Sequence, residues 1–190
     1  MPRPPVTIAF DAPIEELNGR VIVRFPADAS AELPSRGQVA AEVTVSTGDS
    51  SDGPLATVIE PDGLRGHWLP LDKFPGADEA EEGTLVSIRL TTTKDWPEPD
   101  IPDDLAAALS DAPDLRETWE DITPMARWEW VRWVLATKNP GTRAKRVHVT
   151  IDKLRNGKRR PCCFDLSSCT DPNLAKSGML MPAVPAGGKS

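Results

Sequence analysis

The amino-acid sequence predicts an α+β protein: a small split antiparallel β-barrel, then a helical module of about four short helices, then an irregular C-terminal tail. Three observations support this prediction. Short runs with alternating apolar residues fill the first ninety positions, and the apolar spacing changes to about 3.6 residues after residue 102. Proline, at 20 of 190 residues, is about twice its usual ~5% share and gathers where the pattern changes.

Six short apolar runs predict the strands of the barrel. The turn Pro61-Asp62-Gly63 separates two of them, since proline presets φ and glycine accepts the left-handed position. With no helical pattern between them, the strands form an antiparallel sheet whose edges must close or be covered, and a small barrel is the simplest solution. The predicted strands are 6–10, 21–25, 38–45, 55–59, 67–71 and 85–90.

Helical spacing begins after an acidic, proline-rich segment. Pro102 suits a first helical position, and the acids behind it oppose the positive end of the helix dipole. A second short helix follows over 115–122, and Thr123 with Pro124 begins a third, which we expect to run to Lys138. The apolar positions of the first two helices are Leu105, Ala108, Leu109 and Ala112, then Leu115, Trp119 and Ile122.

The third helix carries two apolar stripes, with Glu129 and Arg132 along one seam between them. We therefore expect it to pack on two neighbours: the rest of the helical module, and either the barrel or a second copy of the chain in a homodimer. Core packing or a partner face is the expected role of its tryptophans. The stripes are Trp128, Val131 and Leu135, and Ala126, Trp130, Trp133 and Val134.

The last helix is predicted from Asn139-Pro140 to Gly157, a suitable residue to follow a helix end. Residues 147–151 alternate and are rich in β-branched side chains, which would also suit a strand. Helical spacing of the apolar residues around them, together with Lys and Arg in the last turn, favours the helix.

Charge and proline divide the chain into four parts. These are a barrel domain over 1–92, an acidic linker over 93–101, a helical module over 102–156 and a Cys- and Pro-containing tail over 157–190. Residues 1–100 carry 8 basic and 18 acidic groups, whereas the whole chain has a net charge of −7. Prolines and glycines in 170–190 predict an irregular, protease-sensitive segment.

Residues 138–160 form a basic segment, with nine Lys or Arg and the single acid Asp152. One interpretation is a weak, sequence-blind site for a polyanion or a protein partner. The other is a solvated helix whose charges offset the dipole or meet the acidic barrel. No aromatic platform is expected beside these charges. The candidate anion-binding residues are Lys138, Arg143, Arg146, Lys153, Lys158, Arg159 and Arg160.

The sequence contains no convincing catalytic or metal-binding constellation. The phosphate-loop, dinucleotide and zinc-protease motifs are absent, which favours a protein that is not an enzyme and needs no cofactor. The loop 48–53 resembles the surroundings of a serine nucleophile but is better explained as a hairpin turn. As an alternative function, a small-molecule-binding protein or enzyme would use His67 at the mouth of the barrel.

The three cysteines and the hydropathy bear on the location of the protein. Cys162, Cys163 and Cys169 are an odd number within eight residues, which is not a secreted disulfide framework, and a fourth ligand for zinc is missing. Partly buried thiols are the simplest interpretation, with redox pairing as an alternative. No apolar run approaches the ~20 residues of a membrane span, so we expect a cytoplasmic protein.

Several segments resemble a known family. Residues 102–105, 136–138, 142–146 and 154–159 resemble the YdeI/OmpD-associated family, also called bacteriocin-protection proteins. Phe10, Phe25-Pro26, the 39–45 strand and Gly66-His67 resemble the domain of unknown function that often precedes that module. The resemblance covers about 6–160 and implies a split barrel followed by helices, with no enzymatic activity or cofactor. It implies a non-enzymatic binding or stress- and bacteriocin-protection role.

Overall fold

The computed structural model describes residues 4–162 and 165–183, which form two compact units. The first unit contains residues up to Trp96 together with 166–169 and 174–183, and the second contains 97–162, Asp165 and 170–173. The predicted fold class, an antiparallel barrel followed by helices, is confirmed.

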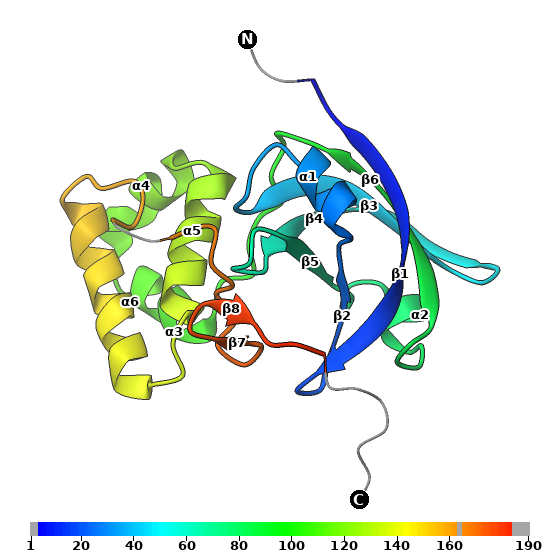
Figure 1. The fold of residues 1–190 in the computed structure, drawn as a ribbon. Coiled ribbons are helices and arrows are strands. Elements are labelled where there is room, and N and C mark those ends of the chain that lie inside the picture. The colour runs from blue at the N-terminus through cyan, green and yellow to red at the C-terminus, as the bar shows by residue number, and fades with distance from the viewer. Residues whose placement is uncertain (1–3, 163–164, 184–190) are drawn as a thin grey trace, which may run out of the picture. The chain divides into compact units, whose positions relative to one another are not determined.

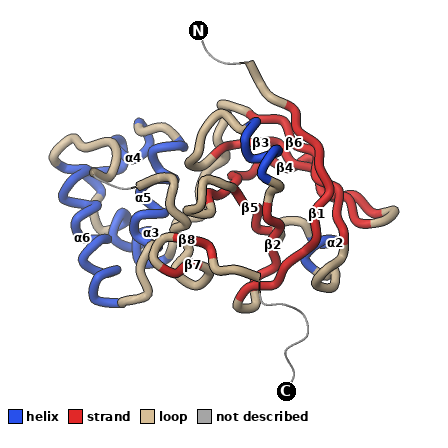
Figure 2. Tube along the Cα trace, viewed as in Figure 1, coloured by secondary structure: helices blue, strands red, loops and turns tan. Residues whose placement is uncertain are grey.

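The first unit is a closed six-stranded antiparallel barrel in the order β1-β2-β5-β4-β3-β6 (Figure 1). Strands dominate this unit (Figure 2). The short helices α1 (Ala27–Glu32) and α2 (Pro75–Asp78) interrupt the strand sequence. The strands are β1 (Thr7–Leu17), β2 (Arg20–Arg24), β3 (Val39–Thr47), β4 (Ser50–Pro61), β5 (His67–Pro70) and β6 (Leu85–Thr92).

Alternation along the strands fills the barrel with apolar side chains. In β6, Val86, Ile88 and Leu90 are buried whereas the residues between them are exposed, as a period of two requires. Ala29 of α1 and Ala77 of α2 join the same core cluster. The interior of the barrel is therefore a packed hydrophobic core.

All six predicted strands are present, but β1 is longer than predicted. It continues past residue 10 through Pro13 to Leu17, because the β1–β6 pairing runs from Thr7–Thr91 to Pro13–Leu85 and the β1–β2 pairing continues from there. The residues Asp, Pro and Glu in its second half have low strand propensity. Pairing with β6 up to Pro13 and with β2 from Ile14 onward overrides that propensity.

Part of the tail belongs to the first unit, which was not expected from its prolines and glycines. We call residues 166–169 and 174–183 the strap. It contains a two-stranded hairpin, β7 (Ala175–Lys176) and β8 (Met179–Leu180). Buried strap residues cover outward-facing barrel residues, so this part of the tail is packed rather than free. The cluster consists of Leu17, Ile22 and Trp68 from the barrel and Cys169, Leu174 and Leu180 from the strap.

The second unit is helical. Its elements are α3 (Asp103–Ser110), the 3-10 turn η1 (Pro113–Leu115), α4 (Arg116–Asp121), α5 (Pro124–Leu135) and α6 (Pro140–Arg155). Helix α6 packs on α3 and α5 (Figure 1), and it buries Val147, Thr150, Ile151 and Leu154 on one face. The helical interpretation of 147–151 is therefore correct.

Capping side chains fix two of the predicted helix starts, those of α5 and α6, whereas Pro102, predicted at the first helical position, lies one residue before α3. Thr123 Oγ1 accepts a hydrogen bond from Ala126 N–H at 3.2 Å, and Asn139 Oδ1 accepts one from Thr142 N–H at 2.9 Å. Helix α5 ends at Leu135, three residues before the predicted end at Lys138. The reason is that Ala136 adopts ψ 29° and leaves the helical region.

Candidate functional site

The basic segment 138–160 is built mainly on α6 and the residues that follow it. The buried face of α6 is narrow, so its Lys and Arg side chains lie at the edges of that face or on the solvent side. Gly157, with φ +75°, follows the helix end as predicted. The arrangement of these cations decides which of them remain available to a partner.

Four arginines of this segment each bind an acid on a different helical element. Arg143 binds Asp104 of α3 through two hydrogen bonds of 2.6 and 3.0 Å, and Arg155 binds Asp114 of η1 through two of 2.8 and 3.1 Å. Such forked pairs are the stronger and more directional ion pairs. The other two pairs are Arg159 with Asp121 of α4, at 2.7 Å, and Arg160 with Glu129 of α5.

Proton affinities reflect the same pairs. Hydrogen bonding from Arg143 lowers the pKa of Asp104, and hydrogen bonding from Arg155 lowers the pKa of Asp114. The pKa of the Arg160 guanidinium is raised, chiefly by its hydrogen bonds to Glu129. These cations already have anionic partners inside the helical unit, and a phosphate would have to compete with those partners.

Glu129 is the buried member of this set. Its side chain is 4% exposed, whereas that of Arg160 is 53% exposed. Arg132 of the same helix is also buried. The sequence placed both residues on a seam between two apolar stripes but gave no sign that this seam lies inside the unit. The feature that could have indicated their burial was the position of two charged residues between apolar stripes that contain tryptophans.

An aromatic ring does accompany the basic segment, contrary to expectation. The Arg146 guanidinium carbon lies 5.5 Å from the centroid of the Trp133 ring, and Lys153 Nζ lies 5.6 Å from it. Arg146 also donates a hydrogen bond to the Trp133 carbonyl at 2.7 Å, which satisfies an acceptor near the end of α5. Two of the predicted anion-binding residues therefore contact a tryptophan.

Three lysines differ from these arginines. Lys138, Lys145 and Lys158 are exposed, and their side chains make no hydrogen bond or ion pair with the residues that the structure describes. Lys145 was not among the residues singled out in the sequence. These lysines are the cations of the segment that an external anion meets first.

The three tryptophans of α5 have different environments. Trp130 is fully buried, and its indole N–H donates to the Arg159 carbonyl at 3.1 Å. Trp128 is half-buried, and its indole N–H donates to the Pro97 carbonyl at 2.6 Å. Trp133 is half-buried and meets Trp130 edge-on at 6.0 Å between ring centroids. Trp130 is thus a core residue, as its apolar stripe indicated.

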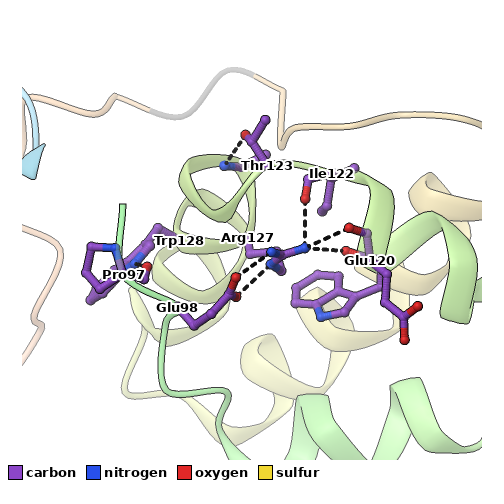
Figure 3. Close-up of polar contacts among 9 residues, drawn as sticks. Pro97, Glu98, Glu120, Ile122, Thr123, Arg127 and Trp128 are labelled. Carbon is purple, nitrogen blue, oxygen red and sulfur yellow. Dashed lines mark hydrogen bonds and ion pairs between the residues drawn. The ribbon is translucent and has the colours of Figure 1, made fainter. Parts of the chain in front are cut away.

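Arg127 is a structural residue that the sequence analysis missed (Figure 3). Its guanidinium donates to both carboxylate oxygens of Glu98, at 2.9 and 2.6 Å. The same group donates to the carbonyls of Trp119, at 2.8 Å, and Ile122, at 2.7 Å, at the end of α4. With the Trp128–Pro97 hydrogen bond, this contact attaches residues 97–98 of the predicted linker to the helical unit.

His67 lies at the start of β5 and is 1% exposed. Its Nε2 is 3.1 Å from the Gly37 carbonyl oxygen, whereas Nδ1 is buried and has no hydrogen-bond partner among the described residues. Burial lowers the pKa of His67 below 6.5, although Asp62 and nearby carbonyl groups act in the opposite direction. The interior of the barrel is apolar, and the polar groups that act on this imidazole belong to residues 35–37 and Asp62.

The remaining candidates lie apart from one another. Residues 48–49 form the turn of the β3–β4 hairpin, whereas 50–53, which were expected to belong to that loop, begin strand β4. Asp52 accepts a hydrogen bond from Gly76 N–H at 2.9 Å. Cys162 is exposed and Cys169 of the strap is buried against the barrel, while Cys163 lies outside the described residues. In residues 4–162 and 165–183, no cluster of three His, Cys, Asp or Glu side chains could hold a metal ion.

Among the described residues, none of the helices has both the length and the apolar character of a bilayer-crossing segment.

Comparison with known families agrees with the division of the chain into a barrel unit and a helical unit. Residues 98–157 match the family described as bacteriocin-protection, YdeI or OmpD-associated. Residues 10–90 match a domain of unknown function, DUF1905. No curated protein and no solved structure gives a significant match to the chain. The chain therefore combines a DUF1905 domain, here a closed β-barrel, with a helical module of the YdeI/OmpD-associated, bacteriocin-protection family.

Proposed function

We propose that this chain is a non-enzymatic binding protein with a protective role of the bacteriocin-protection type. In this proposal the helical unit contacts an anionic partner through the basic segment 138–160. The family description of residues 98–157 supports the protective role. The observation that carries the binding role is that Lys138, Lys145 and Lys158 are exposed and have no partner among the described residues, whereas the arginines around them are internally paired.

The arginine pairs support different roles for the two residue types: the arginines bind acids inside the helical unit, and the lysines remain available to the partner. Arginine holds carboxylates through a planar fork, whereas lysine acts as a mobile point charge. A partner that meets lysines alone is held by charge rather than by shape. Binding should therefore be weak, independent of sequence and sensitive to salt.

Heparin and a mixed-sequence single-stranded DNA are suitable probes. We expect binding of the intact protein at about 20 mM salt, where screening is slight, and loss of binding as salt rises. Replacing Lys138 and Lys158 with Ala should weaken binding to both probes by a similar factor. Each lysine that contacts a phosphate should also reduce the slope of log K against log salt by about 1.

The matched control is the double substitution of Lys94 and Lys176 with Ala. Both lysines are exposed and belong to the first unit, and the change in net charge is the same. Equal loss of binding in both double variants would show a general charge effect and refute the assigned surface. Undetectable binding by the intact protein at low salt would refute the anionic partner. The protective role is tested separately, as survival of bacteria that express the chain during exposure to a bacteriocin.

A further inference from the structure

The strap is fastened at two points to connecting loops of the barrel, in addition to the hydrogen bond that Arg24 of β2 donates to the Met181 carbonyl. The first of these points lies in the β4–β5 turn. Leu180 N–H donates to the Asp62 carbonyl at 2.8 Å. The next residue, Gly63, has φ +74°, and a Cβ there would collide with the Gly178 carbonyl oxygen. The backbones of turn and strap therefore touch directly at this point.

The second fastening point is the connection between α1 and β3. A Cβ built on Gly37 would lie 3.0 Å from the Leu166 carbonyl oxygen, so the strap passes close to this backbone as well. Between the two points the strap covers the apolar outer face of Ile22 and Trp68, which are 0% and 2% exposed. Burial of these side chains is the main source of strap affinity.

His67 links the two fastening points. Its Nε2 is hydrogen-bonded to Gly37, and the residue before it, Gly66, donates its N–H to Asp62 Oδ1 at 2.8 Å. When Nε2 carries the proton and donates to the Gly37 carbonyl, Nδ1 is a buried acceptor without a partner. A second proton on this ring would therefore create a buried N–H donor and a positive charge that water cannot reach.

The charged groups that face His67 come from two loops. The Asp62 carboxylate favours the imidazolium, whereas the Arg36 guanidinium, which donates to the Arg65 carbonyl at 3.0 Å, opposes it. The Ser35 and Gly37 carbonyls also favour the charged form, yet burial outweighs all of these. Proton uptake is consequently easier in any state in which these loops separate and admit water.

We propose that proton uptake by His67 releases the strap from the barrel and uncovers the apolar face formed by Leu17, Ile22 and Trp68. Because burial lowers the pKa of His67 in the docked state, docking is strongest above the ordinary value of 6.5. Below 6.5 the released state binds one more proton than the docked state. Docking then weakens by up to about tenfold for each pH unit, until the pKa of the docked state is reached.

Cys169, a residue of the strap itself, provides a reporter, since it is buried in the cluster that the strap forms with Leu17, Ile22 and Trp68 of the barrel. In a chain with Cys162→Ser and Cys163→Ser, 4,4′-dithiodipyridine, which reacts with thiols in mildly acidic solution, labels Cys169 alone. The rate is normalised to that of the unfolded chain at each pH. We expect it to rise up to about tenfold per pH unit below 6.5. His67→Gln, which retains a donor for the Gly37 carbonyl, should remove this dependence.

Two further variants serve as controls. His148→Gln changes the second histidine of the chain, which is 76% exposed on α6, and should leave the dependence unchanged. Gly63→Ala should give fast labelling at every pH, because its Cβ pushes the strap away. A flat rate in the parent chain, or an undiminished dependence in His67→Gln, would overturn the proposal.

Global unfolding must be distinguished from strap release. The far-ultraviolet circular dichroism of the intact chain should remain constant over the window in which labelling accelerates, and its parallel loss would refute a local release. If His67→Gln does not fold, amide exchange in the intact protein decides the question. The protection factor of Leu180 should fall below pH 6.5 while that of Ile88 in β6 is retained; a common fall of both would contradict the proposal.

Discussion

The barrel and the helical unit stabilise their folds by different means. The barrel closes its hydrogen-bond ladder and directs alternating residues into one apolar core. The helical unit has short elements and small clusters, and its last helix and exit segment bind each preceding element through a forked or ion-paired arginine. The difference shows that backbone pairing and apolar burial together orient the strands of a closed sheet. Short helices packed side by side require directional polar contacts as well.

The largest effect should come from the barrel core. Leu90→Ala in β6 removes a side chain that is 1% exposed and should lower the free energy of unfolding by about 2–5 kcal/mol, because it leaves a cavity. Urea unfolding measures the change. Leu85→Ala on the same strand is the control, since Leu85 is 63% exposed and should cost within about 0.5 kcal/mol. Equal losses of unfolding free energy in the two variants would contradict the view that apolar burial stabilises the barrel.

A smaller but clear effect should come from Arg160→Ala in the helical unit. This change leaves the buried Glu129 carboxylate without its forked donor, and an unsatisfied buried group costs about 1–3 kcal/mol. Thermal unfolding measures it. Arg155→Ala is the matched control because its partner, Asp114, is exposed, and it should give no measurable change. If the two variants behave alike, burial of Glu129 is not what makes this pair important.

Helix capping should contribute about 1 kcal/mol. Asn139→Ala removes the acceptor for Thr142 N–H and should destabilise the helical unit by that amount. Asn139→Asp keeps an acceptor at the cap and serves as the control. Amide exchange along α6, compared with β6, should show the loss in the helical unit and not in the barrel. A loss spread evenly over both units would mean that they unfold together.

The smallest effect is the pH dependence of the Asp104–Arg143 pair. Because Arg143 lowers the pKa of Asp104 in the folded state, the pair stabilises the protein above pH 3.8. That contribution is lost as pH falls through the folded-state value. The stability difference between the intact protein and Asp104→Asn should therefore be present at pH 6 and shrink below pH 4 in urea unfolding. A difference that stays constant with pH would assign it to something other than charge.

Period and turn chemistry predicted the barrel strands and the helices, because these signals are local. In β3, every residue that alternation placed inside is buried, and in 21–25 Val23 and Phe25 are buried whereas Val21 is half-buried. Helix starts at Thr123 and Asn139 followed from cap chemistry in the same way. Local patterns could not show which acid each arginine meets, since the partners are 31 to 41 residues apart.

Packing of the strap could not be predicted from the tail itself. Leu174 and Leu180 are isolated apolar residues among prolines and glycines, which locally indicate an irregular segment. The available signal was in the barrel. Residues 21–23 and 67–69 place apolar or aromatic side chains on both faces of their strands, so an outer cover was required.

The late position of the strap in the chain has a consequence for synthesis on the ribosome. All six barrel strands are complete by residue 92, whereas Leu180 is added 88 residues later. At a translation rate of about 5–20 residues per second, the nascent barrel spends roughly 4–18 s before its cover is made. Throughout that interval Ile22 and Trp68 face solvent or a chaperone. Slower translation of the helical module lengthens the exposure, so the yield of folded protein should depend on codon choice within residues 93–180.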